Sequence, residues 1–212
     1  MAHLKTILFD FDGTIADTLS TVIEIVNKNA QSWGYRQVKA DEIEKLKGMT
    51  PFEVMKEFAV PFYKVPFLVK KVQMELFADM DIVRIFPGMK KTIQELHDDG
   101  FHLGIITSNT EENVKRFLNA NDITSFHYIH SERNIFGKSR SIENFIHHRR
   151  LNKAHVIYIG DEVRDIEAAR KSGIECVSVT WGFNTKKLLT EHTPQYIVDT
   201  PKALLTILEG LH

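Results

Sequence analysis

The sequence predicts an α/β protein, a three-layer doubly wound parallel sheet with a helical domain inserted after the first strand. The apolar run Thr6–Phe9 does not alternate with polar residues, which is typical of a strand buried on both faces. From residue 83 onward, short apolar runs alternate with segments of helical periodicity. We therefore expect a core made of residues 1–15 and 83–212, and a helical cap made of residues 16–82.

The cap is expected to contain helices only. An apolar stripe from Leu19 to Trp33, followed by Gly34, predicts its first helix. Asp41–Lys47 predicts a shorter helix, and Thr50-Pro51-Phe52-Glu53 predicts a helix start in which Thr50 is the N-cap residue and Glu53 closes a capping box. A last helix is expected to end near Met80. The large apolar side chains of this region are interpreted as cap core, with a substrate pocket as the alternative: Phe52, Met55, Phe58, Phe62, Phe67, Met74 and Phe77.

The rest of the chain is expected to alternate helices and strands, which places ligand sites at the carboxyl ends of the strands. The expected strands are Phe101–Ile106, Phe126–Ile129, Val156–Ile159 and Cys176–Val179. The expected helices are Met89–Asp99, Glu111–Ala120, Ser141–Arg150 and Asp165–Ser172, of which the first is closed by Gly100 and the last by Gly173.

Two carboxylates follow the first strand. Asp10 and Asp12 are two residues apart, so strand geometry points them to the same face. Two like charges at the end of a buried strand cost several kcal/mol unless a cation neutralises them. Gly13 and Thr14 then predict a tight turn whose free backbone N–H groups suit an anion. Metal, phosphate and a nucleophilic carboxylate fit this one small space.

Polar residues also end the later strands. Thr107-Ser108-Asn109 precedes a helix, where hydroxyl and N–H groups can hold a phosphate, although Asn109 alone is better interpreted as a helix cap acting with Glu112. Lys138 is expected in a loop, and by itself it would be a solvated lysine. Asp161 and Asp165 lie one helical turn apart, and the helix dipole alone would favour such a pair. Together these residues place an acidic cluster, a hydroxyl and a lysine at one sheet edge.

These segments resemble the four motifs of the haloacid dehalogenase-like superfamily, in the same order. The motifs are Phe9-Asp10-Phe11-Asp12-Gly13-Thr14, Ile106-Thr107-Ser108-Asn109, Lys138, and Ile159-Gly160-Asp161 with Asp165. The insert resembles the cap of the phosphoglycolate phosphatase-like branch. The resemblance implies a Mg²⁺-dependent phosphatase that hydrolyses a small phosphomonoester, such as a phosphoglycolate-like metabolite, through an aspartyl-phosphate.

The resemblance also implies roles for the acidic residues. Asp10 would be the nucleophile that attacks phosphorus. Asp12 would protonate the leaving alkoxide and then deprotonate the attacking water. Asp10, the backbone carbonyl of Asp12 and Asp161 would hold Mg²⁺, a hard ion that prefers oxygen ligands. Asp165 would be a further ligand or would act through its neighbours.

The remaining motif residues would bind the phosphoryl group. Thr107 would bind a phosphoryl oxygen, and Lys138 would offset the charge of Asp10 and of the phosphate. Gly13, Thr14 and Ser108 would supply further contacts to the phosphate.

Two alternative functions stay open. Residues 46–50 resemble the cap loop of beta-phosphoglucomutases, but Pro51 stands where those enzymes have an arginine, and Val22 stands where they have a catalytic histidine. A catalytically silent module that binds a phosphorylated metabolite is the second alternative, although it has no need of both aspartates of the first motif. For the phosphatase, Lys47-Gly48-Met49-Thr50 is the expected substrate-reading loop of the cap.

The composition limits the classes of binding partner and of cellular compartment that we expect for this protein. The 212 residues carry a net charge of −1, which gives no broad electrostatic footprint for nucleic acid or for a membrane surface. The lone Cys176 excludes an internal disulfide and suits a reducing compartment. Met1 leads directly into the first strand, without a signal peptide or a long apolar span. We expect a cytoplasmic protein whose partner is a small phosphorylated metabolite; the sequence indicates no oligomeric state.

Overall fold

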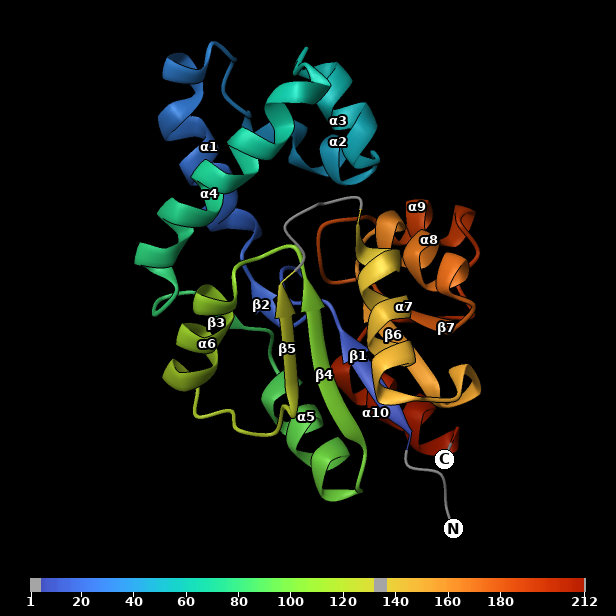
Figure 1. The fold of residues 1–212 in the computed structure, drawn as a ribbon. Helices are drawn as coiled ribbons and strands as arrows, with labels where there is room; N and C mark the ends of the chain where they lie inside the picture. The colour runs from blue at the N-terminus through green and yellow to red at the C-terminus, as the bar shows by residue number, and fades with distance from the viewer. Residues whose placement is uncertain (1–4, 132–136, 212) are drawn as a thin grey trace.

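The computed structural model describes residues 5–131 and 137–211, so residues 1–4, 132–136 and 212 of the expected core lie outside it. Within the described residues, one six-stranded sheet is parallel throughout (Figure 1). Its strands, in spatial order, are β5 (Tyr128–Ser131), β4 (His102–Thr107), β1 (Thr6–Phe9), β6 (Val156–Gly160), β7 (Glu175–Val179) and β8 (Tyr196–Val198).

The central position of β1 follows from its buried residues. Ile7 and Phe9 point into the hydrophobic core on one face of the sheet, whereas Leu8 points into the core on the other face. Leu8 lies opposite Gly104 of β4 and Tyr158 of β6. Because both faces are covered, the strand can be apolar throughout, as its sequence indicated. Residues that follow β1 therefore emerge at the middle of the carboxyl edge of the sheet.

Helices cover both faces of the sheet, which confirms the predicted doubly wound fold. The core that contains Ile7 and Phe9 includes residues of α5 (Met89–Asp98), α6 (Glu111–Ala120) and α10 (Pro201–Gly210). The core that contains Leu8 includes residues of α7 (Lys138–Arg149), α8 (Val163–Ser172) and α9 (Lys186–Glu191). Short 3₁₀ helices occupy Ala40–Glu42, Phe62–Lys64 and Lys153–His155.

The remaining helices lie beyond the carboxyl ends of the strands, above the arrowheads of β4 and β5 in Figure 1. They are α1 (Leu19–Trp33), α2 (Ile43–Lys47), α3 (Pro51–Glu57) and α4 (Val65–Asp79). Gly34 ends α1 in a left-handed conformation with φ of 80°, and Thr50 forms the expected capping box with Glu53. Both signals are local, so they were readable from the sequence.

Two expectations about this region are wrong. The insert is not helical throughout, because β2 (Ala16–Asp17) pairs with β3 (Arg84–Ile85) in a short antiparallel sheet. The chain leaves and re-enters the core side by side, so its two connections can share backbone hydrogen bonds.

Most of the large apolar side chains of the insert are also not cap core. Met55 and Phe58 are half-buried and line a cavity, which is described below. The others lie at the surface, with exposed fractions from 43% at Phe77 to 67% at Phe52 and Met74. Helical spacing showed that these residues share helix faces, but it did not show whether another element covers each face. The exposed set is Phe52, Phe62, Phe67, Met74 and Phe77.

Among the described residues, no helix is both long enough and apolar enough to cross a bilayer.

Candidate active site

Asp10 is a buried carboxylate at the end of the central strand. Its backbone N–H continues the ladder with β6 by donating to the Ile159 carbonyl at 2.8 Å, and its side chain is only 1% exposed. The carboxylate oxygen Oδ1 accepts a hydrogen bond from the Phe11 N–H at 2.8 Å, which fixes the orientation of the group. The other oxygen, Oδ2, lies 2.9 Å from the ammonium of Lys138. Asp10 thus presents one oxygen to a buried cation.

Lys138 is the first residue of α7, and it is 4% exposed. The expectation that Lys138 lies in a loop is therefore wrong, because the helix begins three residues earlier than its apolar spacing indicated. The Lys138 ammonium also lies 2.5 Å from Asp165 Oδ1. Burial alone would lower the pKa of Lys138, but the Asp10 and Asp165 carboxylates outweigh burial and raise that pKa above its ordinary value. The lysine is a fixed positive charge beside Asp10.

Asp12 accepts a hydrogen bond from Asn109, a residue that was expected to cap a helix. The side-chain amide of Asn109 donates to Asp12 Oδ1 at 3.1 Å. Asn109 does not cap the next helix, because Thr110 is the N-cap residue of α6 and accepts from the Asn113 N–H at 3.2 Å. Burial and the charge of Asp10 raise the pKa of Asp12 to about 6. A carboxyl group with this pKa can both give and take a proton near neutral pH.

The expected phosphate-binding residues Thr107 and Ser108 occupy the end of β4, next to Asp12. The Thr107 hydroxyl is buried and accepts the N–H of Asn109 at 3.1 Å, so its own proton can point to a ligand. The Ser108 carbonyl accepts from the Gln73 side chain of α4, and its hydroxyl lies 3.4 Å from Nη1 of Arg164. These contacts tie the strand end to the cap and to α8.

Gly13 and Thr14 hold Asp161 instead of offering free N–H groups. Their N–H groups donate within the turn, to Ala16 at 2.9 Å and to Phe11 at 3.3 Å, so the expectation of free donors is wrong. The Thr14 hydroxyl donates to Asp161 Oδ1 at 2.7 Å. Gly13 has φ of 77°, and a Cβ at this position would overlap the Asp161 carboxylate. The turn therefore packs directly against this aspartate.

A buried acidic cluster lies at the same edge. Asp10, Glu162 and Asp165 each place a carboxylate oxygen within 4.8 Å of the others, and the sequence reading missed Glu162. The Asp161 carboxylate lies outside that group, because Thr14 and the Phe183 N–H hold it. Burial is the largest cause that raises the pKa of Asp161, and the negative charges of Glu162, Asp165 and Asp10 raise this pKa further. Burial also raises the pKa of Asp165 to about 6, against the opposing effect of Lys138.

The balance of charge in this site favours a metal ion. Five carboxylates, including Asp12, share this site with the two cations Lys138 and Arg164, and repulsion among the carboxylates adds to burial in raising the pKa of Asp12, Asp161 and Asp165. Carboxylate oxygens are the ligands that Mg²⁺ prefers, and a divalent cation would remove most of this repulsion. The donor set therefore fits the predicted magnesium site.

Arg164 is a second residue that the sequence reading missed. It lies in the first turn of α8, and its Nε donates to Glu162 Oε2 at 2.5 Å. Both residues lie within the Gly160–Asp165 segment that carried the fourth motif, so the signal was their position next to the two motif aspartates. The ion pair aims a guanidinium at the space above Ser108. Such a group can bind an anion with two parallel hydrogen bonds.

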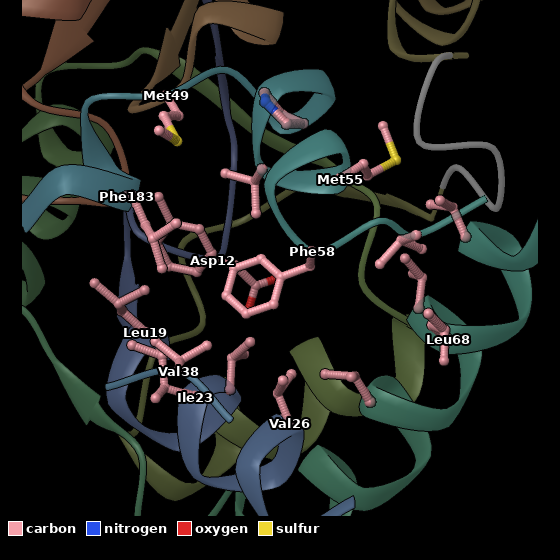
Figure 2. A pocket seen from close by; sticks show the side chains of 18 of the residues that line it. Asp12, Leu19, Ile23, Val26, Val38, Met49, Met55, Phe58, Leu68 and Phe183 are labelled. Atoms are coloured by element: carbon pink, nitrogen blue, oxygen red, sulfur yellow. The ribbon is translucent and has the colours of Figure 1, made fainter. Parts of the chain in front are cut away.

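The predicted substrate-reading loop lies over the same space, and Asn184 holds it to the core. The Asn184 amide donates to the carbonyls of Lys47 and Met49 at 3.2 Å each, and its Oδ1 accepts the N–H of Val163. Lys47 and Met49 line the cavity that reaches Asp12, and Met49 is labelled in Figure 2. Gly48 and Thr50 are not among the residues that line it, and Thr50 serves as the N-cap of α3.

Comparison with known proteins identifies the family of the chain. A family model described as haloacid dehalogenase-like hydrolase matches residues 7–179. A phosphoglycolate phosphatase of Synechococcus elongatus is 32% identical over 203 residues, which cover 95% of this chain and 96% of that protein. The chain belongs to the haloacid dehalogenase-like hydrolase family, as its four motifs indicated.

Solved structures share the whole fold. The crystal structure of a predicted phosphatase from Clostridium acetobutylicum superposes with a TM-score of 0.82 at 23% identity and covers 98% of this chain and 100% of that chain. A Thermotoga maritima protein described as a candidate beta-phosphoglucomutase has a TM-score of 0.70 at 20% identity, covering 99% and 100%. At these identities the likeness concerns the fold alone.

Proposed function

We propose that the chain is a Mg²⁺-dependent phosphatase that hydrolyses phosphomonoesters through an aspartyl-phosphate on Asp10. One observation carries this proposal: two carboxylates follow the same strand and lie in different environments. Asp10 has a cation at 2.9 Å, whereas Asp12 has an amide donor and a pKa of about 6. The first environment suits a nucleophile, and the second suits an acid–base group.

In the first half of the reaction, an Asp10 carboxylate oxygen attacks phosphorus. The bond between phosphorus and the alcohol oxygen breaks, and Asp12 gives its proton to that oxygen. Lys138 offsets the negative charge that gathers as the carboxylate and the phosphoryl group approach. Thr107 is placed to donate its hydroxyl proton to a phosphoryl oxygen.

In the second half, Asp12 is a carboxylate and takes a proton from water. The water oxygen attacks the phosphorus of the aspartyl-phosphate, which releases inorganic phosphate and restores Asp10. Asn109 keeps the Asp12 carboxylate in one orientation through both halves. Asp12 therefore serves as the general acid in the first half of the reaction and as the general base in the second half.

The metal site is proposed at the acidic cluster. Asp10, the Asp12 carbonyl, Asp161 and Asp165 are the proposed ligands, and the position of Glu162 adds it to this set. Bound Mg²⁺ would offset the negative charge of the phosphoryl oxygens as Asp10 approaches them. Lys138 already occupies one side of Asp165, so this aspartate is proposed to orient the lysine as well.

The helices α1–α4 are proposed to act as a cap, with residues 16–82 as its expected bounds. They contribute most of the lining of the cavity above Asp12. A cap that closes this cavity would exclude water from the aspartyl-phosphate until the alcohol has left. The Synechococcus relative makes phosphoglycolate the first small metabolite to test.

A mutase needs a cap residue that binds a second phosphate. The two cap positions where beta-phosphoglucomutases carry polar groups are Pro51 and Val22 here, and both line the cavity with apolar atoms. These residues favour hydrolysis over transfer to a second hydroxyl of a sugar phosphate.

Trapping the phosphoenzyme tests the proposal. We expect mass spectrometry of protein quenched during turnover to find the added phosphoryl group on Asp10. The Asp10→Asn variant should fold normally and lose activity by at least about a thousandfold. Asp17→Asn is the control, because Asp17 is an exposed aspartate of the same segment. A phosphoryl group on another residue, or full activity of the Asp10 variant, would contradict the mechanism.

A further inference from the structure

The cap helices and the carboxyl edge of the sheet line a partly open cavity of about 450 Å³ that reaches Asp12. Figure 2 shows Leu19, Ile23 and Val26 of α1 on one side of this space, and Met55 and Leu68 on another. Protein interiors are packed like organic crystals, and voids larger than a water molecule are few. A cavity of this size lies in the range of ligand sites, roughly 300–1,000 Å³. The size of this cavity therefore indicates a ligand site.

The walls and the floor of the cavity differ in chemistry. Aliphatic and thioether side chains of the four cap helices form most of the walls. Asp12, Ser108, Asn109 and Arg164 form part of the floor, at the carboxyl edge of the sheet. A phosphoryl group on Asp10 and its neighbours would lie at this floor, so the rest of the substrate has to extend toward the walls.

One of the polar residues that line the cavity, Arg36, already has partners within the cap. Arg36 pairs with Glu42 at 2.7 Å, and its guanidinium carbon lies 4.2 Å from the centre of the Phe58 ring. It is therefore already engaged within the cap. A short, charged leaving group such as glycolate has two cations of the lining, Lys47 and Arg164, for its carboxylate, but it would leave the apolar walls without contacts.

We propose that the preferred substrate is the phosphate monoester of an aliphatic alcohol, with its hydrocarbon tail in the cap cavity. This inference rests on the proposed phosphatase function. The alcohol oxygen lies beside Asp12 during bond cleavage, and Asp12 lines the cavity, so the carbon chain continues from the reacting bond into the apolar space. Burial of the tail supplies the binding energy, and the floor supplies the chemistry.

A series of linear alkyl phosphates, from ethyl to decyl, tests this proposal in the presence of Mg²⁺. We expect kcat/KM to rise roughly threefold to fourfold for each added methylene until the cavity is full. Octyl phosphate should exceed phosphoglycolate by roughly a hundredfold or more. Equal kcat/KM for ethyl and octyl phosphate, in an enzyme that turns both over, would overturn the proposal and leave the phosphatase function standing.

Binding provides a readout that does not depend on turnover. Decylphosphonate cannot be hydrolysed, and calorimetry should show that it binds at least tenfold tighter than ethylphosphonate, with a more negative heat-capacity change. If no ester is hydrolysed but decylphosphonate still binds in this way, the phosphatase function fails and the apolar tail site stands. If the two phosphonates bind equally, the tail site is absent.

Variants locate the site. Val26→Trp should fill the cavity from α1, remove the dependence on chain length and weaken decylphosphonate binding, while ethyl phosphate is still hydrolysed. Leu68→Trp should do the same from α4 if the first variant does not fold. Glu24→Trp adds the same side chain at an exposed position of α1 and should keep the dependence on chain length. Folded Val26 and Leu68 variants that bind decylphosphonate like the wild type would place the tail elsewhere and overturn the assignment.

Discussion

The side-chain amide of Asn109 donates a hydrogen bond of 3.1 Å to the carboxylate of Asp12. This contact joins the first two sequence motifs across 97 residues and fixes the orientation of the proposed acid–base group. Asn109 is itself held, because its Oδ1 accepts from the Thr110 N–H and from the Asn113 side chain. The orientation of Asp12 is therefore set by a chain of hydrogen bonds that reaches into α6.

Asn109→Ala should lower kcat for an alkyl phosphate by roughly tenfold to a hundredfold, because a hydrogen bond to a charged group is lost. Thr110→Ala is the matched variant. It removes the N-cap side chain of α6 and should lower the free energy of unfolding by about 1 kcal/mol with little effect on kcat. Steady-state kinetics and denaturant unfolding separate the two roles. The same pattern of losses in both variants would mean that Asn109 acts only through the helix.

Asp12→Asn should affect substrates according to their leaving groups. An alkoxide needs a proton as it leaves, so kcat for an alkyl phosphate should fall by about 10²- to 10⁴-fold. An aryl oxide needs no proton, so phosphorylation of Asp10 by p-nitrophenyl phosphate should continue. Because water activation is also lost, the phosphoenzyme should accumulate, which quenched-flow mass spectrometry would detect. Equal losses for the two esters, without a phosphoenzyme, would remove the acid–base role.

Gly13→Ala should lower the stability of the protein by more than backbone strain alone, because the new side chain should also displace Asp161. Gly13 and Gly100 have similar φ values of 77° and 86°, so alanine costs about 1–2 kcal/mol at either position. A Cβ at Gly13 would also overlap the Asp161 carboxylate, whereas a Cβ at Gly100 would meet nothing within 4 Å. Gly13→Ala should therefore lose more stability than Gly100→Ala, by about a further 1–3 kcal/mol, and should weaken Mg²⁺ binding. Thermal unfolding and metal titration of both variants provide the comparison, and equal effects would mean that the turn yields without moving Asp161.

Removal of metal should make stability depend on pH. The pKa of Asp12 rises from 3.8 to about 6 on folding, so at intermediate pH the folded protein binds a proton that the unfolded chain does not. The contribution of Asp12 to the free energy of unfolding should therefore be greatest below about pH 4. It should fall as the pH rises to 6 and above. Asp12 alone accounts for about 3 kcal/mol of this loss.

The measurement is thermal unfolding from pH 4 to pH 8 in EDTA and in Mg²⁺. Asp165 has a pKa raised in the same direction and should add to the effect. Mg²⁺ should flatten the profile, because the cation stabilises the carboxylates without a proton. A flat profile in EDTA would show that these carboxylates are not destabilised in the folded protein.

Local signals in the sequence were sufficient for most of the elements. The strand Thr6–Phe9 and the helices Leu19–Trp33 and Glu111–Ala120 have the bounds that their patterns indicated. The capping box at Thr50 and the left-handed glycines Gly34 and Gly173 lie where they were expected. These features depend on neighbours within a few residues, so a single sequence carries them.

The order of the motifs also placed the residues of the proposed site at one edge of the sheet. In a parallel sheet every strand ends at the same edge, so Asp10, Thr107 and Asp161 had to come near one another once the strands were recognised. The sequence by itself thus determined the family and the sheet, and it predicted that Asp10, Thr107 and Asp161 lie at one edge of that sheet.

Only the tertiary structure decided the partners of those residues. Asn109 was free to cap a helix or to contact Asp12, and Lys138 was free to face solvent or Asp10, because such choices depend on atoms that are distant in sequence. The aromatic residues of the cap had the spacing of a core, yet most of them lie at the surface while the interior is hollow. Periodicity shows which side chains share a face, but the burial of that face depends on how the helices pack against one another and against the core.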